Sequence, residues 1–365
     1  MKIYIENYGC TANKNNAEII RGILSKKHKL VKSEEDADVV IINSCVVKGP
    51  TENRIAKRIS DIKKPLVVAG CMVDARKELI KKIRPDASLV SVRKISDIER
   101  AVSLLSNDKI KIEDAKKEIK KKNEIKIVLP KKSFSKKIEI LQIAEGCLGN
   151  CTYCITKIAK GKLFSYPERK IIDAIKKSRA KEIWITSQDC GAYGRDKGTN
   201  LVNLLKKVLR ATEKKKNFQI RIGMMNPNFV KEMINELIRI YKNDKIKKFL
   251  HIPLQSGSNE ILKKMNRKYS AEDFIRIVKK FRKNFSDIHI KTDVIVGFPG
   301  ETEKDFEDTL KVIKETKPNS LNISRFWPRP KTEAKKMKQL PDYIIMQRSK
   351  KIKELFSELK NKNIK

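Results

Sequence analysis

Short apolar runs alternate with amphipathic segments along the first hundred residues. Runs rich in Ile, Val and Leu occur at 3–5, 39–42, 66–68 and 88–91. Helical spacing of apolar residues occurs at 15–26, 52–61, 75–83 and 95–105. Runs that are apolar at every position are typical of parallel strands buried on both faces. The pattern therefore predicts an open parallel α/β domain over residues 1–105.

The same alternation becomes more regular further along the chain. Strands are expected at 138–143, 182–186, 219–223, 249–254, 289–296 and 320–326. Helices are expected between them at 168–180, 201–213, 227–241, 271–283 and 302–315. Six strands in alternation with helices favour a partial (β/α)6 barrel over residues 137–340, with its active site at the carboxyl ends of the strands. Residues 106–136 are rich in Lys and predict a basic linker, and residues 341–365 predict a C-terminal helix.

The charge balance is strongly basic. The chain has 84 Lys and Arg residues against 44 Asp and Glu residues, a formal net charge of +40. Genome composition or heat adaptation can enrich Lys, but heat-adapted surfaces usually balance Lys with Glu. We therefore favour a polyanionic partner, and nucleic acid over a lipid surface. No run approaches eighteen apolar residues and the chain opens directly into a strand, so we expect a cytoplasmic protein without membrane span or secretory signal.

Three of the seven cysteines form one tight motif. Cys147, Cys151 and Cys154 have the spacing C-x3-C-x2-C. In a cytosolic chain, such cysteines indicate metal or redox chemistry, not disulfides. A zinc ribbon needs two C-x2-C pairs, and the second pair is missing. Three close thiolates suit a four-iron cluster held through three of its irons, with the fourth iron open to another ligand.

Three further cysteines each follow one of the N-terminal apolar runs. They are Cys10, Cys45 and Cys71. Because the carboxyl ends of parallel strands share one edge of a sheet, these cysteines could converge there. We favour a second three-cysteine cluster over three separate buried thiols. Cys190 is interpreted as an ordinary thiol at a strand end.

The cysteine loop resembles the signature of the radical S-adenosylmethionine (SAM) enzymes. With the three upstream cysteines, the chain resembles the methylthiotransferases of that superfamily, and segments 251–258, 265–269 and 292–302 match as well. Segments 187–196, 221–227 and 324–330 resemble the archaeal and eukaryotic branch that acts on N6-threonylcarbamoyladenosine in tRNA. That family usually ends in a small RNA-binding β-barrel called TRAM, which we expect to be absent because the sequence stops at Lys365.

The resemblance implies a radical mechanism with two [4Fe–4S] clusters and SAM as cofactors. The cluster on Cys147, Cys151 and Cys154 would reduce SAM to a radical that abstracts the hydrogen from C2 of adenine. The cluster on the upstream cysteines would carry a sulfur methylated by a second SAM. The enzyme would thus be a sulfur-group transferase that converts the modified adenosine next to the anticodon to its 2-methylthio derivative. Its partners would be the tRNA anticodon loop and a low-potential electron donor resembling ferredoxin or flavodoxin.

Two other hypotheses stay open at this point. The same chemistry could act on isopentenyladenosine in tRNA or on an aspartate of a ribosomal protein. Alternatively, the chain could be a non-catalytic iron–sulfur or zinc protein that binds RNA. The net charge favours RNA over a free protein side chain, although ribosomes are polyanionic too.

Polar and aromatic residues near the expected strand ends are candidates for cofactor and RNA contacts. The candidates for SAM binding are Tyr153, Gln188, Asp189, Gln255 and Ser256. The four polar ones could equally be turn-forming residues, and Gly297, Pro299 and Gly300 could let the backbone approach a ligand or make a plain turn. The candidates for RNA binding are Lys157, Lys160, Lys162, Arg325, Trp327 and Arg329. These six could meet phosphates or stack a base, or they could be solvated surface.

Overall fold

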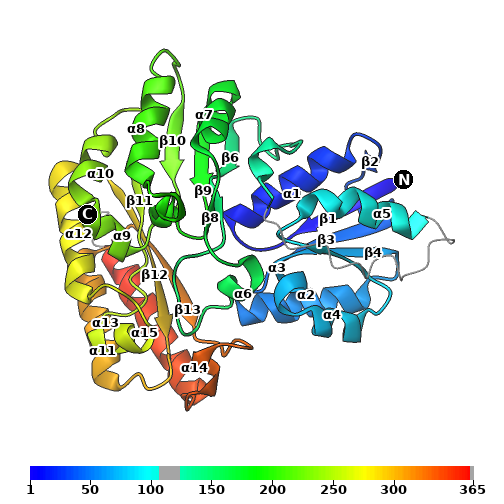
Figure 1. The fold of residues 1–365 in the computed structure, drawn as a ribbon. Helices are drawn as coiled ribbons and strands as arrows, with labels where there is room; N and C mark the ends of the chain where they lie inside the picture. The colour runs from blue at the N-terminus through cyan, green and yellow to red at the C-terminus, as the bar shows by residue number, and fades with distance from the viewer. Residues whose placement is uncertain (107–123, 362–365) are drawn as a thin grey trace. The chain divides into compact units, whose positions relative to one another are not determined.

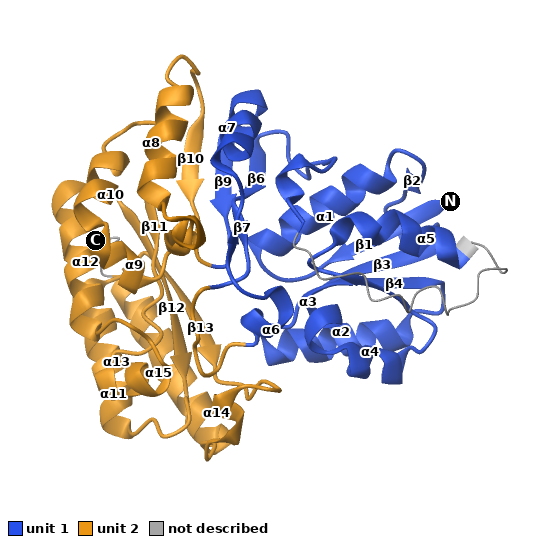
Figure 2. Ribbon diagram, viewed as in Figure 1, with its two compact units in different colours: residues 1–147, 155–188 blue, residues 148–154, 189–365 orange. Residues whose placement is uncertain are grey.

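A computed structural model describes residues 1–106 and 124–361 and divides the chain into two compact units (Figures 1 and 2). Unit 1 comprises Met1–Cys147 and Ile155–Gln188, and unit 2 comprises Leu148–Cys154 and Asp189–Lys365. Residues 107–123 of the predicted linker and 362–365 of the predicted C-terminal helix lie outside the described residues. The predicted domain boundaries at 105/106, 136/137 and 340/341 stay a prediction.

Unit 1 begins with a five-stranded parallel sheet in the order β2-β1-β3-β4-β5. Its strands are β1 (Lys2–Asn7), β2 (Lys29–Leu30), β3 (Val39–Ser44), β4 (Leu66–Gly70) and β5 (Ser88–Ser91). Every residue of β3 and β4 is buried, which explains the unbroken apolar runs at 39–42 and 66–68. The two-residue strand β2 is too short to leave a pattern, and the sequence analysis did not predict it.

Helices cover both faces of this sheet (Figure 1). One face packs against α1 (Thr11–Leu24) and α5 (Ile98–Ser106), with η1 (Ile95–Asp97) before α5. The other face packs against α2 (Gly49–Asp61), α3 (Cys71–Ala75) and α4 (Lys77–Ile83). The helix expected at 75–83 corresponds to α4, whereas α3 before it was not predicted. The backbone leaves helical geometry between them at Arg76 (φ −142°).

The rest of unit 1 holds a parallel strand pair and a short ribbon. Strand β6 (Ile138–Gln142) pairs with β9 (Glu182–Thr186), and α7 (Glu168–Lys177) lies between them in sequence. The antiparallel ribbon consists of β7 (Ala144–Glu145) and β8 (Phe164–Ser165). Between its strands, α6 (Thr156–Lys160) packs on α3 through a shared apolar cluster that includes Cys71, Ile155 and Ala159.

Residues 124–136, which we call the strap, run along α1. The strap contains η3 (Lys126–Val128). Lys126 Nζ donates to Asn16 Oδ1 (3.2 Å), and the Lys132 N–H donates to Glu18 O (2.9 Å). Gly22 of α1 faces the strap backbone, where an added Cβ would lie 2.5 Å from Lys131 Cα. The second part of the predicted linker is thus packed against the α/β domain.

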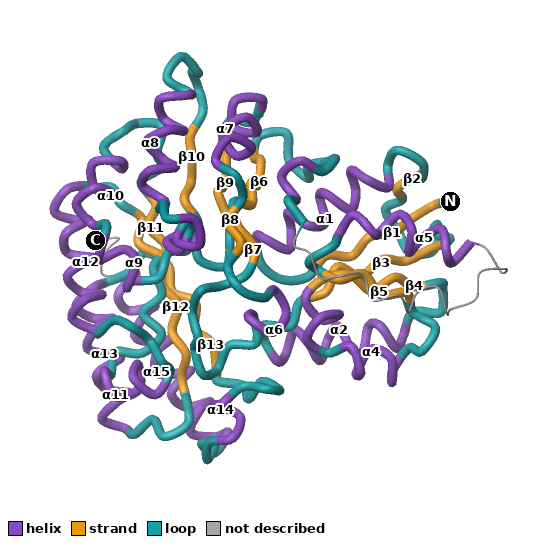
Figure 3. The backbone as a smooth tube through the Cα atoms, in the orientation of Figure 1, coloured by secondary structure: helices purple, strands orange, loops and turns teal. Residues whose placement is uncertain are grey.

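Unit 2 contains the remaining strands, with helices packed along them (Figure 3). Strands β11 (Phe249–His251), β12 (His289–Val296) and β13 (Ser320–Arg325) form a parallel sheet, and β10 (Gln219–Ile222) precedes them. The expected helix at 227–241 is split at Met233. The short elements are η4 (Cys190–Ala192), η5 (Arg195–Lys197), α9 (Pro227–Glu232), α11 (Asn259–Lys264) and α14 (Glu333–Lys336). The longer helices are α8 (Leu201–Ala211), α10 (Ile234–Tyr241), α12 (Ala271–Asn284), α13 (Glu303–Thr316) and α15 (Asp342–Asn361).

Local sequence signals explain where the longer helices of unit 2 begin. Ser270 and Asp273 form a reciprocal capping box at the start of α12, and Thr302 and Asp305 form another at the start of α13. Among residues 1–106 and 124–361, no helix has the length and apolar character needed to cross a bilayer.

Candidate active site

The three N-terminal cysteines lie at the carboxyl ends of neighbouring strands. Cys10 occupies the N-cap position of α1, Cys45 follows β3, and Cys71 begins α3 directly after β4. Gly9 (φ +102°) passes so close to Cys45 that an added Cβ would lie 2.8 Å from its Sγ. The three thiols are near enough to influence one another electrostatically. The structure therefore brings together the three cysteines that the strand-end rule selected.

Three asparagines, two of them buried, tie these strand ends together, and we call them the asparagine clasp. It consists of Asn7, Asn13 and Asn43. Asn13 Nδ2 donates to the carbonyl oxygens of Tyr8 (2.6 Å) and Ser44 (2.9 Å). Asn43 Nδ2 donates to Asn13 O and to Asn7 Oδ1, both at 2.7 Å. Cys71 Sγ lies 3.9 Å from Asn13 Oδ1, so the clasp reaches the cysteines directly.

The sequence analysis missed the clasp, although a signal was present. An Asn directly after a fully apolar run, as in Asn43-Ser44-Cys45, must satisfy its buried amide locally. Such a residue marks a strand end whose loops are held by hydrogen bonds.

Burial disfavours the thiolate form of Cys45 and Cys71, and a bound cation would stabilise that form. Burial raises the pKa of the Cys45 thiol, and it raises the pKa of Cys71 to about 12 even though the Lys160 ammonium opposes this shift. Cluster ligands must be thiolates, and coordination to iron enforces that state. In the described part of the chain, no three His, Cys, Asp or Glu side chains lie close enough for one metal ion. A four-iron core instead binds each thiolate through a different iron, so it fits more widely spaced cysteines.

Next to these cysteines lies a buried ion triad of Lys126, Glu145 and Lys160. Lys160 Nζ is 2.6 Å from Glu145 Oε1, Lys126 Nζ pairs with Glu145 Oε2, and all three residues are at most 2% exposed. Burial alone would raise the pKa of Glu145, but the two ammonium groups lower it to about 2. The carboxylate is therefore ionised, and it holds the lysines in place.

The triad corrects the expected role of Lys160. The sequence suggested that Lys160 meets RNA phosphates, but its ammonium is paired inside unit 1 and is not open to solvent. Of the two neighbouring candidates, Lys157 is half-buried and Lys162 is exposed. Exposure leaves Lys162 able to meet a phosphate.

The first part of the cysteine loop is fixed where it leaves the ribbon. The Cys147 N–H donates to Gly161 O (3.1 Å), and Gly146 (φ +74°) lies against the Lys162 backbone, where no side chain would fit. These contacts belong to unit 1, as does Cys147.

Within unit 2, an arginine reaches the second cysteine of the loop. Arg267 Nη1 donates to Cys151 Sγ (3.1 Å), and Nη2 donates to Asn226 Oδ1 (3.0 Å). The Tyr269 hydroxyl accepts from Arg267 Nε (3.2 Å) and donates to Leu254 O (2.9 Å). The sequence analysis used this segment for the resemblance but gave Arg267 no role.

The candidates for SAM binding occupy different surroundings. Tyr153 packs edge-on against Phe298, with ring centroids 6.3 Å apart. Both amide atoms of Gln188 are buried, and neither has a hydrogen-bond partner among the described residues. A buried amide without partners costs free energy unless a ligand or water satisfies it, so Gln188 fits a polar cofactor.

The other polar candidates have visible structural roles. Asp189 accepts the N–H groups of Gly191 (3.0 Å) and Asn226 (3.1 Å), and burial raises its pKa to about 6 despite these bonds. Gln255 has a left-handed backbone (φ +66°) and bridges to β12 through both its N–H and its carbonyl. Ser256 is fully buried, with its Oγ 3.4 Å from Thr309 Oγ1 of α13. The strained backbone at Gln255 is typical of functional loops.

The RNA candidates at the end of β13 and after it differ in their exposure to solvent. Arg325 is exposed and Trp327 is 46% exposed, as a phosphate contact and a stacking surface require. Arg329 is only 4% exposed, so its guanidinium does not present the open surface that the sequence suggested. Cys190 is fully buried at the start of η4.

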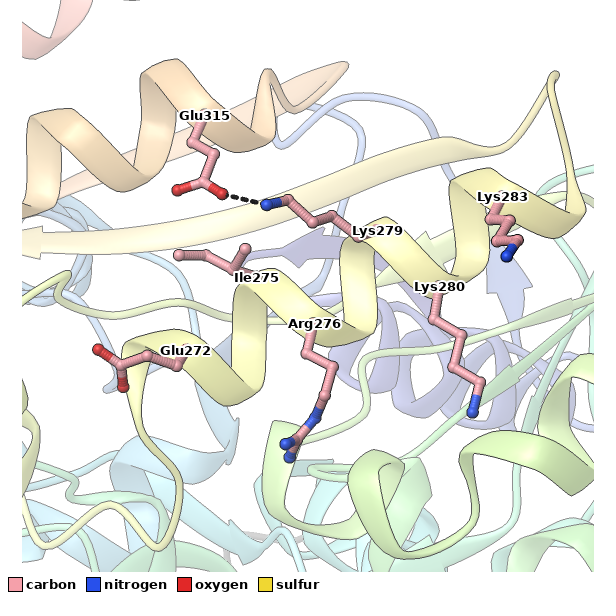
Figure 4. Close-up of a pocket in the computed structure, with 7 residues that line it drawn as sticks. All are labelled: Glu272, Ile275, Arg276, Lys279, Lys280, Lys283 and Glu315. Carbon is pink, nitrogen blue, oxygen red and sulfur yellow. Dashed lines mark ion pairs between the residues drawn. The ribbon is translucent and has the colours of Figure 1, made fainter.

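A basic hollow of about 630 Å³ is lined by residues of α12 and by Glu315 of α13 (Figure 4). Its lining includes Arg276, Lys279, Lys280 and Lys283, and Lys279 pairs with Glu315 of α13 (2.5 Å). None of the residues expected to bind cofactor or RNA lines this hollow.

Comparison with known proteins decides the family. A family model of the Radical SAM superfamily matches residues 141–313, and a model of the Uncharacterized protein family UPF0004 matches residues 2–91. A Pyrococcus horikoshii protein named "Probable threonylcarbamoyladenosine tRNA methylthiotransferase" is 42% identical over 359 residues, which cover 96% of this chain and 82% of that protein. The chain belongs to the threonylcarbamoyladenosine tRNA methylthiotransferase family. The recognition made from the cysteine motifs is thereby confirmed.

Eukaryotic members of the threonylcarbamoyladenosine tRNA methylthiotransferase family are also similar. The Homo sapiens enzyme is 37% identical over 366 residues, which cover 97% of this chain and 62% of the human protein. Among solved structures, the radical SAM methyltransferase TsrM from Kitasatospora setae has a TM-score of 0.64 at 11% identity, covering 91% of this chain and 76% of that chain. At that identity the likeness concerns the fold alone, and it confirms the predicted α/β fold. The radical SAM assignment is confirmed by the family model over residues 141–313.

Proposed function

We propose that this protein is a tRNA methylthiotransferase that converts N6-threonylcarbamoyladenosine next to the anticodon to its 2-methylthio derivative. The observation that carries the proposal is the gathering of Cys10, Cys45 and Cys71 in a chain of this family that also has the C-x3-C-x2-C loop. A non-catalytic iron–sulfur or zinc protein that binds RNA would need only one of these two cysteine sets. We therefore assign an auxiliary cluster to the N-terminal triad and the SAM-binding cluster to the loop.

The target carbon explains why such cofactors are needed. The hydrogen on C2 of adenine is not acidic, so acid–base catalysis by side chains cannot replace it. When bound, the iron–sulfur clusters and SAM supply the radical chemistry and the sulfur. The protein supplies six thiolates, and Arg267 donates a hydrogen bond to the thiolate of Cys151. The unsatisfied amide of Gln188 is the best-supported contact to the polar part of SAM.

The proposed substrate also implies how tRNA binds, where in the cell the protein acts and which electron donor it uses. The target base lies in a single-stranded loop, so exposing it costs a few kcal/mol or less. Exposed Lys162, Arg325 and Trp327 are suited to phosphates and a stacked base, and the basic face of α12 offers further phosphate contacts. We propose a cytoplasmic location and a ferredoxin- or flavodoxin-like electron donor, since both follow from a reductive reaction on tRNA.

The decisive experiment is nucleoside mass spectrometry of tRNA from cells with and without the gene for this protein. We expect the 2-methylthio derivative of N6-threonylcarbamoyladenosine to disappear in the deletion strain and to return with the wild-type gene. The gene carrying Cys10→Ala should fail to restore it, whereas Cys190→Ala serves as the matched control and should restore it. Loss of a methylthio group from isopentenyladenosine instead would assign the second substrate, and unchanged tRNA would refute the proposal.

The cluster count is tested separately by anaerobic reconstitution. Two four-iron clusters predict about eight irons per chain, and replacing either triad with Ala predicts about four. Variants without the loop cysteines should form no 5′-deoxyadenosine, while variants without the N-terminal cysteines should still form it. A wild-type plateau near four irons would remove the auxiliary cluster from the proposal.

A further inference from the structure

Lys160 is a buried cation beside the N-terminal cysteines. It ends α6, which packs on α3, the helix that begins with Cys71. Arg93 donates to the carbonyl oxygens of Ile158 (3.0 Å) and Ala159 (3.3 Å), which anchors this end of α6 within unit 1. The Lys160 ammonium is close enough to the thiol of Cys71 to interact with it electrostatically.

On formal charges the ion triad has an excess of one positive charge. It contains two ammonium groups and one carboxylate, and the fourth group hydrogen-bonded to Glu145 is the neutral amide of Gln142 (2.8 Å). A net charge in a protein interior is costly unless an opposite charge lies nearby. Apart from Glu145, the groups of potential negative charge that act on Lys160 most strongly are the thiols of Cys71 and Cys10.

We propose that Lys160 is the counter-charge of the cluster bound by Cys10, Cys45 and Cys71, and that it raises the reduction potential of that cluster. This inference rests on the proposed function, because it requires the auxiliary cluster. Three thiolates leave a four-iron cluster with net negative charge, and reduction adds one more negative charge. A fixed ammonium in a dry environment stabilises the reduced form more than the oxidised form.

Two ion pairs on Glu145 hold the Lys160 ammonium in a fixed position. Glu145 holds Lys160 from one side, and Lys126 of the strap holds the other oxygen of the same carboxylate. Glu145 stands two residues before Cys147, so the counter-charge is fixed to the base of the second cysteine motif. Lys160 is therefore a positioning residue that acts through charge, without contact to the substrate.

The test uses the full chain carrying Cys147→Ala, Cys151→Ala and Cys154→Ala, so that only the auxiliary cluster forms. Lys160→Met removes the charge and keeps much of the side-chain volume, and Lys160→Arg is the matched control that keeps the charge. The midpoint potential is measured by redox titration followed by electron paramagnetic resonance. We expect Lys160→Met to disfavour reduction about tenfold, which corresponds to a decrease of about 59 mV for a one-electron couple. Lys160→Arg should stay close to the parent.

The Met variant should fold, because Lys126 still neutralises Glu145. Lys126→Met is the second probe. It also removes one ammonium from the triad. The thiol of Cys71 interacts less strongly with Lys126 than with Lys160, so the effect of Lys126→Met on the reduction potential should be smaller.

The outcomes separate the inference from the proposed function. Equal potentials in the parent and in Lys160→Met, or equal shifts in the Met and Arg variants, would overturn the role of Lys160 and leave the cluster assignment intact. A parent protein that binds no iron after reconstitution would overturn the auxiliary cluster and the inference together.

Discussion

Asp189 illustrates how one buried carboxyl group influences stability at the residue scale. It lies 5% exposed after β9 and accepts two backbone N–H groups. Burial nevertheless raises its pKa from 3.8 to about 6. The hydrogen bonds organise the loops after β9 and β10, while the ionised state costs free energy in the folded protein.

This cost predicts a pH dependence. Because the folded-state pKa lies above the unfolded-state value, the folded state binds the proton more tightly, and the free energy of unfolding falls as the pH rises from about 4 to about 6. Asp189→Asn keeps an acceptor oxygen and removes this titration. We expect its stability relative to wild type to increase by about 3 kcal/mol between pH 4 and pH 7. Chemical denaturation of the metal-free protein across that range checks this, and a constant difference would contradict it.

Arg267 predicts an effect on cofactor chemistry. Arg267→Met removes the hydrogen bond to Cys151 and the bond to Asn226, so the loop thiolate loses its donor. We expect iron binding to persist and the rate of 5′-deoxyadenosine formation to fall about tenfold or more, the effect typical of losing an outer-shell contact. Lys268→Met, at the exposed neighbouring position, is the control and should keep the wild-type rate.

At this scale the sequence identified cysteines better than lysines. Cys10, Cys45 and Cys71 could be grouped because each follows an apolar run, and parallel strands align their ends. The burial of Lys160 could not be foreseen, because its partner Glu145 lies 15 positions earlier and only the β7–β8 ribbon brings them together. A Lys in a basic chain carries no local sign of being buried.

At the element scale, long periodic segments were predicted well and short ones were missed. Strands β1, β3, β4 and β5 of the N-terminal sheet and helices such as α12 and α13 lie close to their predicted positions. Helix α6 and the β7–β8 ribbon span five residues or fewer per element, too few to show a period. These missed elements are the ones that position Glu145 and Lys160.

The contact between α1 and the strap predicts an unusual glycine effect. In an exposed helix interior, replacing Gly with Ala stabilises by about 1 kcal/mol. At Gly22 the added methyl group would collide with the strap backbone at Lys131, so we expect Gly22→Ala to destabilise by about 1–3 kcal/mol. Thermal and urea denaturation measure the change. Lys170→Ala on the exposed face of α7 is the control, and stabilisation by Gly22→Ala would show that the strap does not pack there.

At the scale of the whole molecule, the net charge of +40 is the dominant physical property. Ion pairs such as Lys279–Glu315 leave this net charge unchanged, because the formal sum already counts both members of each pair. Composition alone therefore predicted the sign of the partner's charge. Family membership came from motifs distributed along the chain, which pattern and charge could not have supplied.

The charge predicts salt-dependent tRNA binding. Each neutralised phosphate releases counterions, so affinity should fall at least about tenfold between 50 and 200 mM salt. Lys280→Glu with Lys283→Glu on α12 should weaken binding and flatten the slope if the basic hollow contacts tRNA. Fluorescence anisotropy with labelled tRNA measures both effects. An affinity that does not change with salt would contradict an electrostatic docking mode.

The asparagine clasp has a consequence for how the protein responds to oxygen. Its hydrogen bonds join Asn13 to the ends of β1 and β3 through amides and carbonyls, without any contribution from iron. We therefore expect these strand ends to become ordered when the chain folds, unlike a zinc finger, which is unfolded without metal. If oxygen destroys the proposed auxiliary cluster, we expect the strand ends around it to keep their arrangement, because these hydrogen bonds join protein groups only. Reconstitution with iron and sulfide should then restore the cluster without refolding of the chain.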